Sequence, residues 1–175
     1  MEHAHVPVLG IAAYSGTGKT TLLVRLIPLL TAKGLRIGLI KHSHHHFEVD
    51  HSGKDSFRLR EAGANPVMLS SKYRRAVLTE HETPAEPMLS EQLSHLDQSG
   101  LDLVLVEGFK RETFAKIELH RPSLGKPALY PGDNSIIAVA TDAKLAIATE
   151  IPVLDLNRPE LIARFILADF LSAYD

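Results

Sequence analysis

The stretch that most restricts what this chain can fold into lies near its amino end, where an apolar run, a glycine-rich turn and an amphipathic segment follow one another. The apolar run covers residues 8–12, and the turn reads Ala13-Tyr14-Ser15-Gly16-Thr17-Gly18-Lys19-Thr20. Leucine and isoleucine then recur at helical spacing as far as Leu30. This order predicts a strand, a phosphate-binding loop and a helix, because loop N–H groups and a helix amino end converge on phosphate oxygens.

Seven residues of this loop are predicted to bind a nucleotide, namely Ser15, Gly16, Thr17, Gly18, Lys19, Thr20 and Thr21. Lys19 would add a full positive charge at the β- and γ-phosphates, and the Thr20 hydroxyl can ligate Mg²⁺. Ala13 stands where the usual pattern has its first glycine, and alanine fits there if φ is negative. A glycine-rich turn without a ligand is the alternative, but it gives no reason for Lys and Thr directly after Gly18.

Composition excludes several classes of function. The 19 basic and 21 acidic side chains give a net charge of −2, so no overall field favours nucleic acid or an anionic membrane. The absence of cysteine excludes disulfides, thiolate metal sites and cysteine nucleophiles. Residues 1–6 lack the pattern of a signal peptide, and no apolar run approaches the roughly 18 residues of a membrane span. We therefore expect a cytoplasmic protein with neither nucleic acid nor membrane as a partner.

Strand and helix patterns alternate along the rest of the chain. Further strands are expected over residues 36–40, 101–106, 116–120, 136–140 and 153–154, and helices over residues 90–98 and 159–171. This order predicts an α/β fold of the P-loop NTPase class, with a mostly parallel sheet flanked by helices. We expect residues 1–175 to form one domain, with a small β-hairpin excursion at about residues 64–82.

Polar residues follow several predicted strands, at the sheet edge where such folds bind ligands. Glu107 ends the apolar run 101–106 at a Walker B position, from which a carboxylate reaches Mg²⁺ near Thr20 directly or through water. Gly108 can bring its N–H close to a γ-phosphate. Asp142 follows another strand, and its carboxylate could accept the N1–H and N2–H₂ donors that guanine has and adenine lacks. The alternatives are a solvated Glu107 and a turn-forming or capping Asp142.

The histidine-rich segment at residues 42–51 is the most unusual stretch of the chain. Consecutive histidines cannot all face one ion, which disfavours a structural metal site. A mobile polar loop is one interpretation. The other is a functional loop, in which Asp50 approaches the Mg²⁺ and a second, anionic ligand binds the cationic side chains of Lys41, Lys54 and Arg58.

Several segments together resemble the molybdopterin-guanine dinucleotide biosynthesis protein B (MobB) family, over nearly the whole chain and in order. They are Ser15 to Leu23, Gly38-Leu39-Ile40-Lys41-His42 with His44-His45, Gly53-Lys54-Asp55-Ser56, Arg60 to Ala64, and Val106-Glu107-Gly108-Phe109-Lys110. The resemblance implies a homodimeric protein that binds GTP and Mg²⁺ and hydrolyses GTP weakly. It also implies an accessory role beside the MobA guanylyltransferase and other molybdenum cofactor proteins, when GMP is joined to molybdopterin to form the guanine dinucleotide.

Carried onto this sequence, the resemblance makes residues 16–21 the phosphate site and Glu107 the Walker B residue, and it puts Asp50 near the nucleotide or pterin site. Slow hydrolysis involving Asp50 and Glu107 is favoured, because no glutamine or arginine finger is evident. A small-molecule kinase that uses ATP is the alternative, with Asp50 as base and Lys54 and Arg58 holding the acceptor. A pure adapter with the nucleotide as a switch differs mainly in turnover.

Overall fold

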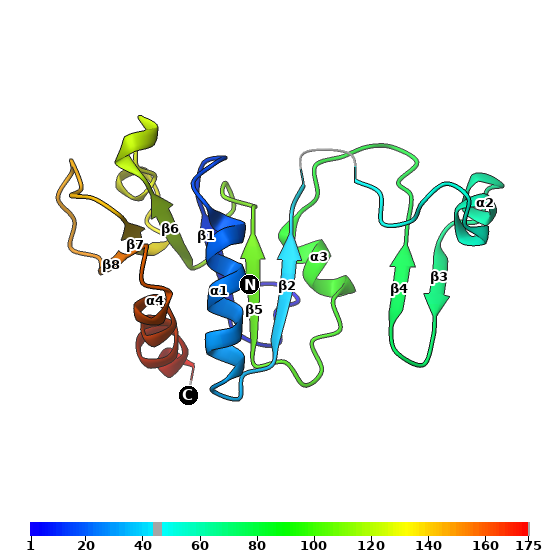
Figure 1. Ribbon diagram of the computed structural model, residues 1–175, viewed down its shortest axis with the longest axis horizontal. Helices are drawn as coiled ribbons and strands as arrows, with labels where there is room; N and C mark the ends of the chain where they lie inside the picture. Colours follow the sequence, from blue (N-terminus) through cyan, green and yellow to red (C-terminus); the bar gives the residue numbers. More distant parts are fainter. Residues whose placement is uncertain (44–46, 175) are drawn as a thin grey trace. The chain divides into compact units, whose positions relative to one another are not determined.

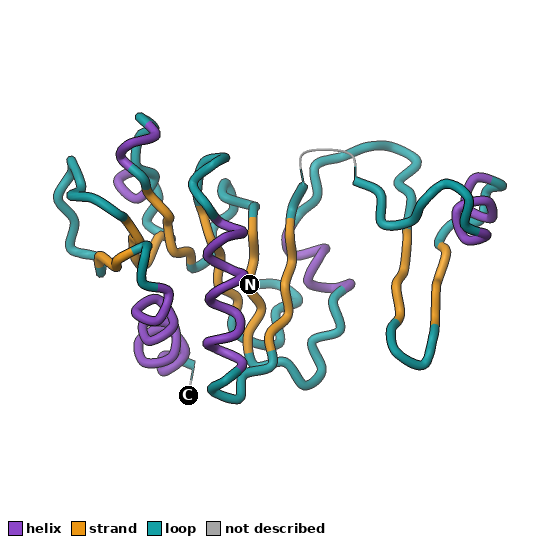
Figure 2. Tube along the Cα trace, viewed as in Figure 1, coloured by secondary structure: helices purple, strands orange, loops and turns teal. Residues whose placement is uncertain are grey.

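A six-stranded, all-parallel sheet carries the phosphate loop in the computed structural model, which describes residues 1–43 and 47–174 (Figures 1 and 2). Its strand order is β2-β5-β1-β6-β7-β8. The strands are β1 (Val8–Ala12), β2 (Ile37–Lys41), β5 (Leu103–Glu107), β6 (Lys116–His120), β7 (Ile136–Thr141) and β8 (Val153–Asp155). All five residues of β1, β5 and β6 are buried, which explains their continuous rather than alternating apolar pattern.

Helices cover both faces of this sheet. Helix α1 (Lys19–Thr31) and helix α4 (Pro159–Phe165) pack on the face that includes Leu9 and Ile11. The chain continues from α4 into a π-helical turn at Ile166–Phe170 and a 3₁₀ turn at Leu171–Ala173. Helix α3 (Leu89–His95) packs on the opposite face. The predicted fold class, a parallel sheet flanked by helices with a small hairpin, is confirmed.

Helix α3 ends earlier than the predicted 90–98 range because Gln98 turns back onto it. The amide of Gln98 is buried and donates hydrogen bonds to the carbonyl oxygens of Leu93 and His3, each 2.8 Å long. One of these bonds satisfies a carbonyl in the last turn of the helix. It also ties the helix end to the amino-terminal segment, so a tertiary contact fixes the helix end here.

Residues Ser43–Glu86 form a second compact unit, separate from the unit formed by Met1–His42 and Pro87–Asp175. The second unit contains α2 (Asp55–Glu61) and an antiparallel hairpin of β3 (Val67–Ser70) and β4 (Arg75–Leu78). Arg60 pairs with both Glu48 and Glu80 and thereby joins three parts of this unit. The hairpin lies within the predicted 64–82 range, although the unit around it is larger.

A buried lysine fixes the loops beside the phosphate loop. Lys116 is 1% exposed, and its ammonium group lies 2.8 Å from a carboxylate oxygen of Asp133. The same group donates to the carbonyl oxygens of Lys110 and Glu112, at 3.3 and 2.6 Å. Because the buried charge is paired and hydrogen-bonded, it holds the loop after β5 against the loop before β7.

In the part of the chain that the structure describes, no helix has both the length and the apolarity to cross a bilayer.

Candidate functional site

The loop between β1 and α1 has the backbone conformation that its glycines allow. Gly16 and Gly18 have φ angles of +80° and +103°, in the left-handed region that side chains disfavour. Thr17 between them is 2% exposed, and its hydroxyl donates a 2.9 Å hydrogen bond to the carbonyl of Tyr14. Gly18 is the residue before α1, and no side chain caps that helix end. The first turn of α1 therefore has the features of an anion-binding helix end.

Lys19 folds back over this loop. Its ammonium group donates to the carbonyl oxygens of Ala13 and Tyr14, at 3.3 and 3.2 Å. Burial lowers the pKa of Lys19, and the nearby Lys110 and Lys41 lower it further, while the Glu107 carboxylate raises it. The positive charge thus lies against the loop, held by two long hydrogen bonds that an anionic ligand can replace.

Thr20, Glu107 and Lys41 meet at the carboxyl ends of three adjacent strands. The Thr20 hydroxyl lies 3.4 and 3.5 Å from the two carboxylate oxygens of Glu107. The Lys41 ammonium group lies 3.6 Å from one of them. Glu107 is 8% exposed, and it faces Lys41 directly in the parallel register of β2 and β5. This set brings a hydroxyl, a carboxylate and a half-exposed ammonium group together.

The donor atoms here suit Mg²⁺, which prefers hard oxygen ligands and usually keeps several waters and phosphate oxygens. Thr20 and Glu107 would supply the protein oxygens. Among residues 1–43 and 47–174, no group of three or more His, Cys, Asp or Glu side chains could hold a metal ion by itself. A magnesium ion carried by nucleotide phosphates needs no such group.

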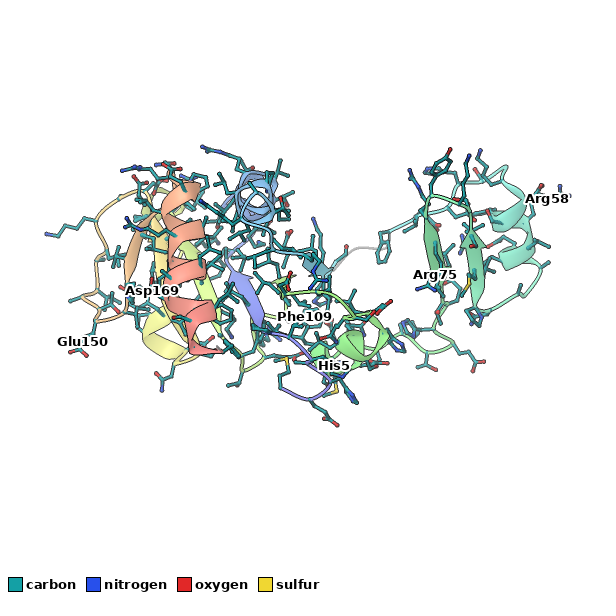
Figure 3. All side chains as sticks on the ribbon, turned by 90° about the horizontal axis from the view of Figure 1, so that it is seen from below. His5, Arg58, Arg75, Phe109, Glu150 and Asp169 are labelled. Carbon is teal, nitrogen blue, oxygen red and sulfur yellow. The ribbon has the colours of Figure 1, made fainter. Side chains whose placement is uncertain are left out.

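Gly108 and Phe109 bring the start of the next loop against His42. Gly108 has a φ of +109°, and a Cβ there would lie 2.6 Å from the Cβ of His42. The His42 N–H donates a 2.8 Å hydrogen bond to the Glu107 carbonyl. The His42 ring stacks on the Phe109 ring with centroids 4.9 Å apart, and Phe109, labelled in Figure 3, is buried. His44, His45 and His46 lie outside the described residues.

An arginine that the sequence analysis missed joins the phosphate loop to Asp142. Arg121 follows β6, and its Nε donates a 2.9 Å hydrogen bond to the Thr17 carbonyl. One of its Nη atoms pairs with Oδ2 of Asp142, the residue after β7. Applying the rule of strand carboxyl ends to β6 as well would have selected Arg121.

Asp50 lies in the second unit, where its side chain organises the turn before α2. One carboxylate oxygen accepts 3.0 Å hydrogen bonds from the Ser56 hydroxyl and the His51 N–H. Asp50 is 7% exposed, and its other oxygen is buried without a hydrogen-bond partner in the described chain. Lys54 precedes α2. Arg58 is exposed, and its Nη1 lies 4.0 Å from Oδ1 of Asp55. The roles predicted for these residues at the metal and at a second ligand stay predictions.

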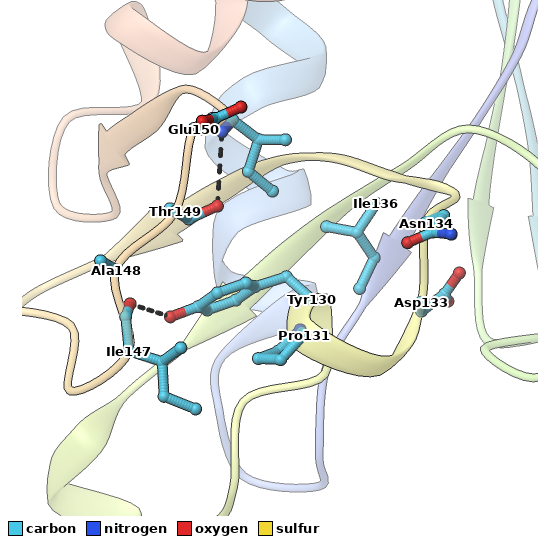
Figure 4. A pocket seen from close by; sticks show the side chains of 10 residues that line it. Tyr130, Pro131, Asp133, Asn134, Ile136, Ile147, Ala148, Thr149 and Glu150 are labelled. Carbon is cyan, nitrogen blue, oxygen red and sulfur yellow. Dashed lines mark hydrogen bonds between the residues drawn. The ribbon is translucent and has the colours of Figure 1, made fainter.

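Two of the cavities among the described residues lie outside the phosphate loop itself. One, of about 460 Å³, borders it through Tyr14, whose ring centroid is 5.0 Å from the Lys110 ammonium group. The other, of about 590 Å³, is bordered by Tyr130, Ile136 and residues 147–151, and the Tyr130 hydroxyl donates to the Ile147 carbonyl (Figure 4). Ile136 begins β7, so the larger cavity lies at the amino end of that strand.

Comparisons with known proteins identify the family to which this chain is similar. The family model described as MobB, molybdopterin guanine dinucleotide synthesis protein B, matches residues 8–142. The molybdopterin-guanine dinucleotide biosynthesis adapter protein of Escherichia coli is 49% identical over 165 residues, covering 93% of this chain and 92% of the relative. Its counterpart in Haemophilus influenzae is 48% identical over 161 residues, covering 92% and 88%.

Solved structures share the fold. A crystal structure of molybdopterin-guanine biosynthesis protein B (mobB) matches with a TM-score of 0.66 at 26% identity, over 94% of this chain and 99% of the other. Bacillus subtilis MobB matches with a TM-score of 0.70 at 22% identity, over 93% and 96%. The resemblance read from the motifs is thus confirmed, and the chain belongs to the MobB family of molybdopterin-guanine dinucleotide biosynthesis adapter proteins.

Proposed function

We propose that this chain is a GTP-binding adapter that assists the attachment of GMP to molybdopterin, and that it hydrolyses GTP slowly with Mg²⁺. One observation carries the nucleotide part: the Thr20 hydroxyl lies 3.4 Å from the Glu107 carboxylate, beside the uncapped amino end of α1. A hydroxyl and a carboxylate at that distance, next to a loop lysine, form the arrangement that phosphate-bound Mg²⁺ requires. The adapter part is taken from the relatives, which are named adapter proteins of this pathway.

The protein's own groups would act mainly by binding and positioning. Loop N–H groups would bind the phosphates, and Lys19 would exchange its bonds to the Ala13 and Tyr14 carbonyls for bonds to phosphate oxygens. Lys41 now faces Glu107, and it would turn toward the ligand once Mg²⁺ takes the carboxylate. Mg²⁺ held by Thr20 and Glu107 would supply charge neutralisation at the phosphates.

Slow turnover is supported by how the groups near the loop are used. Arg121 is close to the loop, but its guanidinium binds the Thr17 carbonyl and Asp142. Phosphoryl transfer is accelerated most when an arginine or a glutamine faces the γ-phosphate or the attacking water. Because the Arg121 guanidinium already binds the loop and Asp142, it would not stabilise the γ-phosphate during hydrolysis. Slow hydrolysis would let an adapter keep its nucleotide.

Asp142 is the proposed reader of guanine, through the N1–H and N2–H₂ donors of the base. It follows β7, two strands from the phosphate loop. The proposed partners are the MobA guanylyltransferase, molybdopterin and a second copy of this chain, and the proposed location is the cytoplasm. The three proposed partners rest on family membership.

The test is a reconstituted GMP transfer to molybdopterin by the guanylyltransferase, with and without this chain. We expect the wild-type chain to raise the yield or rate of dinucleotide formation when GTP and Mg²⁺ are present, and Lys19→Met to give no stimulation. No effect of the wild-type chain would contradict the proposal. Consumption of ATP that depends on an added acceptor would support the kinase alternative instead.

A further inference from the structure

Arg121 bridges three segments that are distant in the sequence. It directly follows β6, and its Nε donates to the Thr17 carbonyl, 104 residues away. Its Nη1 binds Oδ2 of Asp142, 21 residues away, as an ion pair. A single side chain therefore connects the phosphate loop, the end of β6 and the end of β7.

The bridge depends on the shape of a guanidinium group. The planar fork of arginine donates to two acceptors in one plane at once, whereas the ammonium group of lysine is a point charge with no fixed plane. The Arg121 and Asp142 side chains are 30% and 21% exposed, so both are partly shielded from water. The second Nη lies 4.0 Å from the position a Cβ would take at Gly18. The guanidinium thus lies directly against the phosphate loop.

Another arginine–aspartate pair in the same unit shows what an ordinary structural pair looks like. Arg36 donates to both carboxylate oxygens of Asp102, through Nε at 3.0 Å and Nη2 at 2.9 Å. This pair lies before β2 and β5, at the amino edge of the sheet. Both carboxylate oxygens of Asp102 accept hydrogen bonds from the Arg36 guanidinium. Within the described residues, this guanidinium donates to the Asp102 carboxylate alone.

The Arg121 pair is built differently. Its guanidinium is shared between a carboxylate oxygen and the loop carbonyl, and the contact to the carboxylate is at Oδ2. A carboxylate offers about four lone-pair directions, so one bond to Oδ2 leaves acceptor capacity at both oxygens for two N–H donors. A carboxylate that reads guanine must also stay in the plane of the base, so that each oxygen can accept one N–H donor. A hydrogen bond from a fixed donor keeps the carboxylate in that orientation.

We propose that Arg121 is the positioning residue for guanine selectivity, holding Asp142 in the plane that accepts the base and coupling base binding to the phosphate loop. This inference rests on the proposed function, since it takes Asp142 as the reader of guanine. Because Arg121 also holds the carbonyl just before Gly18, a shift of Asp142 on base binding changes a contact to the loop. Adenine has no such donor pair, so its binding would not shift Asp142 or change the contact between Arg121 and the loop.

The experiment is titration calorimetry with Mg²⁺ and GTP, ATP or xanthosine triphosphate on purified full-length chain. The variants are Arg121→Lys, Arg121→Gln, Asp142→Asn and the Arg121→Lys/Asp142→Asn double variant, with Arg36→Lys as the matched control. We expect Arg121→Lys to lower the ratio of GTP to ATP affinity roughly tenfold or more, as loss of a charged hydrogen bond would. We expect Arg36→Lys to keep the wild-type ratio.

The ratio separates positioning from folding, because a poorly folded variant binds every nucleotide less well and keeps the ratio. Arg121→Lys retains the charge and keeps the test valid if Arg121→Gln unfolds. The double variant should lose no more selectivity than Asp142→Asn alone, because Arg121 is proposed to affect selectivity only through Asp142. Asp142→Asn should shift preference toward xanthosine triphosphate, whose base carries an acceptor where guanine has its N2–H₂ donor.

The outcomes distinguish this inference from the function on which it rests. Unchanged selectivity in both Arg121 variants, with selectivity lost in Asp142→Asn, overturns the positioning role and leaves guanine reading by Asp142 intact. Equal wild-type affinity for GTP and ATP, or a selectivity ratio unchanged by Asp142→Asn, overturns guanine reading itself and the inference with it. Losses of selectivity in the Arg121 and Asp142 variants that simply add in the double variant would contradict the proposal that Arg121 acts through Asp142.

Discussion

Replacing Lys19 by methionine should weaken GTP binding about 10- to 150-fold. Charged hydrogen bonds contribute roughly 1.5–3 kcal/mol, and 1.4 kcal/mol corresponds to a tenfold change in affinity. In the free protein the Lys19 ammonium group makes bonds of 3.3 and 3.2 Å to the Ala13 and Tyr14 carbonyls. Both are long for N–H···O bonds, so their loss costs the free protein little. Most of the lost energy should therefore appear in the complex.

Titration calorimetry with Mg²⁺ and GTP measures this loss directly. Lys33→Met is the matched control, because Lys33 is an exposed lysine just after α1 and far along the helix from the loop. It should bind GTP as the wild type does. Thermal unfolding of both variants without nucleotide should resemble that of the wild type. An unchanged dissociation constant for a folded Lys19→Met variant would refute the placement of Lys19 at the phosphates.

Three further predictions concern the metal, the backbone and pH. Glu107→Gln should retain GTP binding at saturating Mg²⁺ but lower Mg²⁺ affinity about tenfold or more, as loss of a charged interaction would, and equal Mg²⁺ titrations of phosphate release would exclude Glu107 from the metal site. Gly108→Ala should reduce the free energy of unfolding in urea by about 1–3 kcal/mol, because its Cβ would lie 2.6 Å from that of His42; wild-type stability would contradict the contact. Hydrogen bonds from Arg36 lower the pKa of Asp102 from 3.8 to about 2, so their stabilisation is complete above pH 3.8 and is lost as pH falls through 2. The difference in thermal midpoint between wild type and Asp102→Asn should therefore close between these pH values, and a constant difference would contradict this reasoning.

The order of strands and helices in the main unit could be predicted because it depends on local pattern. The apolar run at residues 101–106 became β5, and the glycine-rich turn lies between β1 and α1 as its sequence requires. The end of α3 could not be predicted from propensity. It depends on where Gln98 folds back, which is a contact with the amino-terminal segment as well as the helix.

Parts of the site that depend on strand neighbours were only partly foreseeable. The rule of strand carboxyl ends selected Thr20, Glu107 and Asp142 from distant parts of the sequence, and the first two lie 3.4 Å apart. Arg121 escaped because a lone arginine between His120 and Pro122 resembles an ordinary solvated residue. Its partners became apparent only when β6 was found beside β1, with β7 on its other side.

Asp50 was conspicuous in the sequence, and its surroundings there led to the prediction that it approaches the Mg²⁺. One oxygen of its carboxylate accepts hydrogen bonds from the Ser56 hydroxyl and the His51 N–H within the second unit, so local contacts account for one of the two oxygens. An Asp50→Asn variant would separate this local role from the proposed one. Lower stability with unchanged Mg²⁺-dependent hydrolysis would assign Asp50 to the turn alone, and lower hydrolysis at unchanged stability would support its place near the metal.

The most direct test of the proposed GTP site is titration calorimetry of the wild-type chain with GTP, GDP and ATP, each with and without Mg²⁺. We expect tighter binding of GTP than of ATP, with Mg²⁺ strengthening GTP binding more than GDP binding, because the Mg²⁺ ion that Thr20 and Glu107 are proposed to hold would also bind the γ-phosphate. Equal or tighter binding of ATP, or affinity for GTP that does not depend on Mg²⁺, would contradict it.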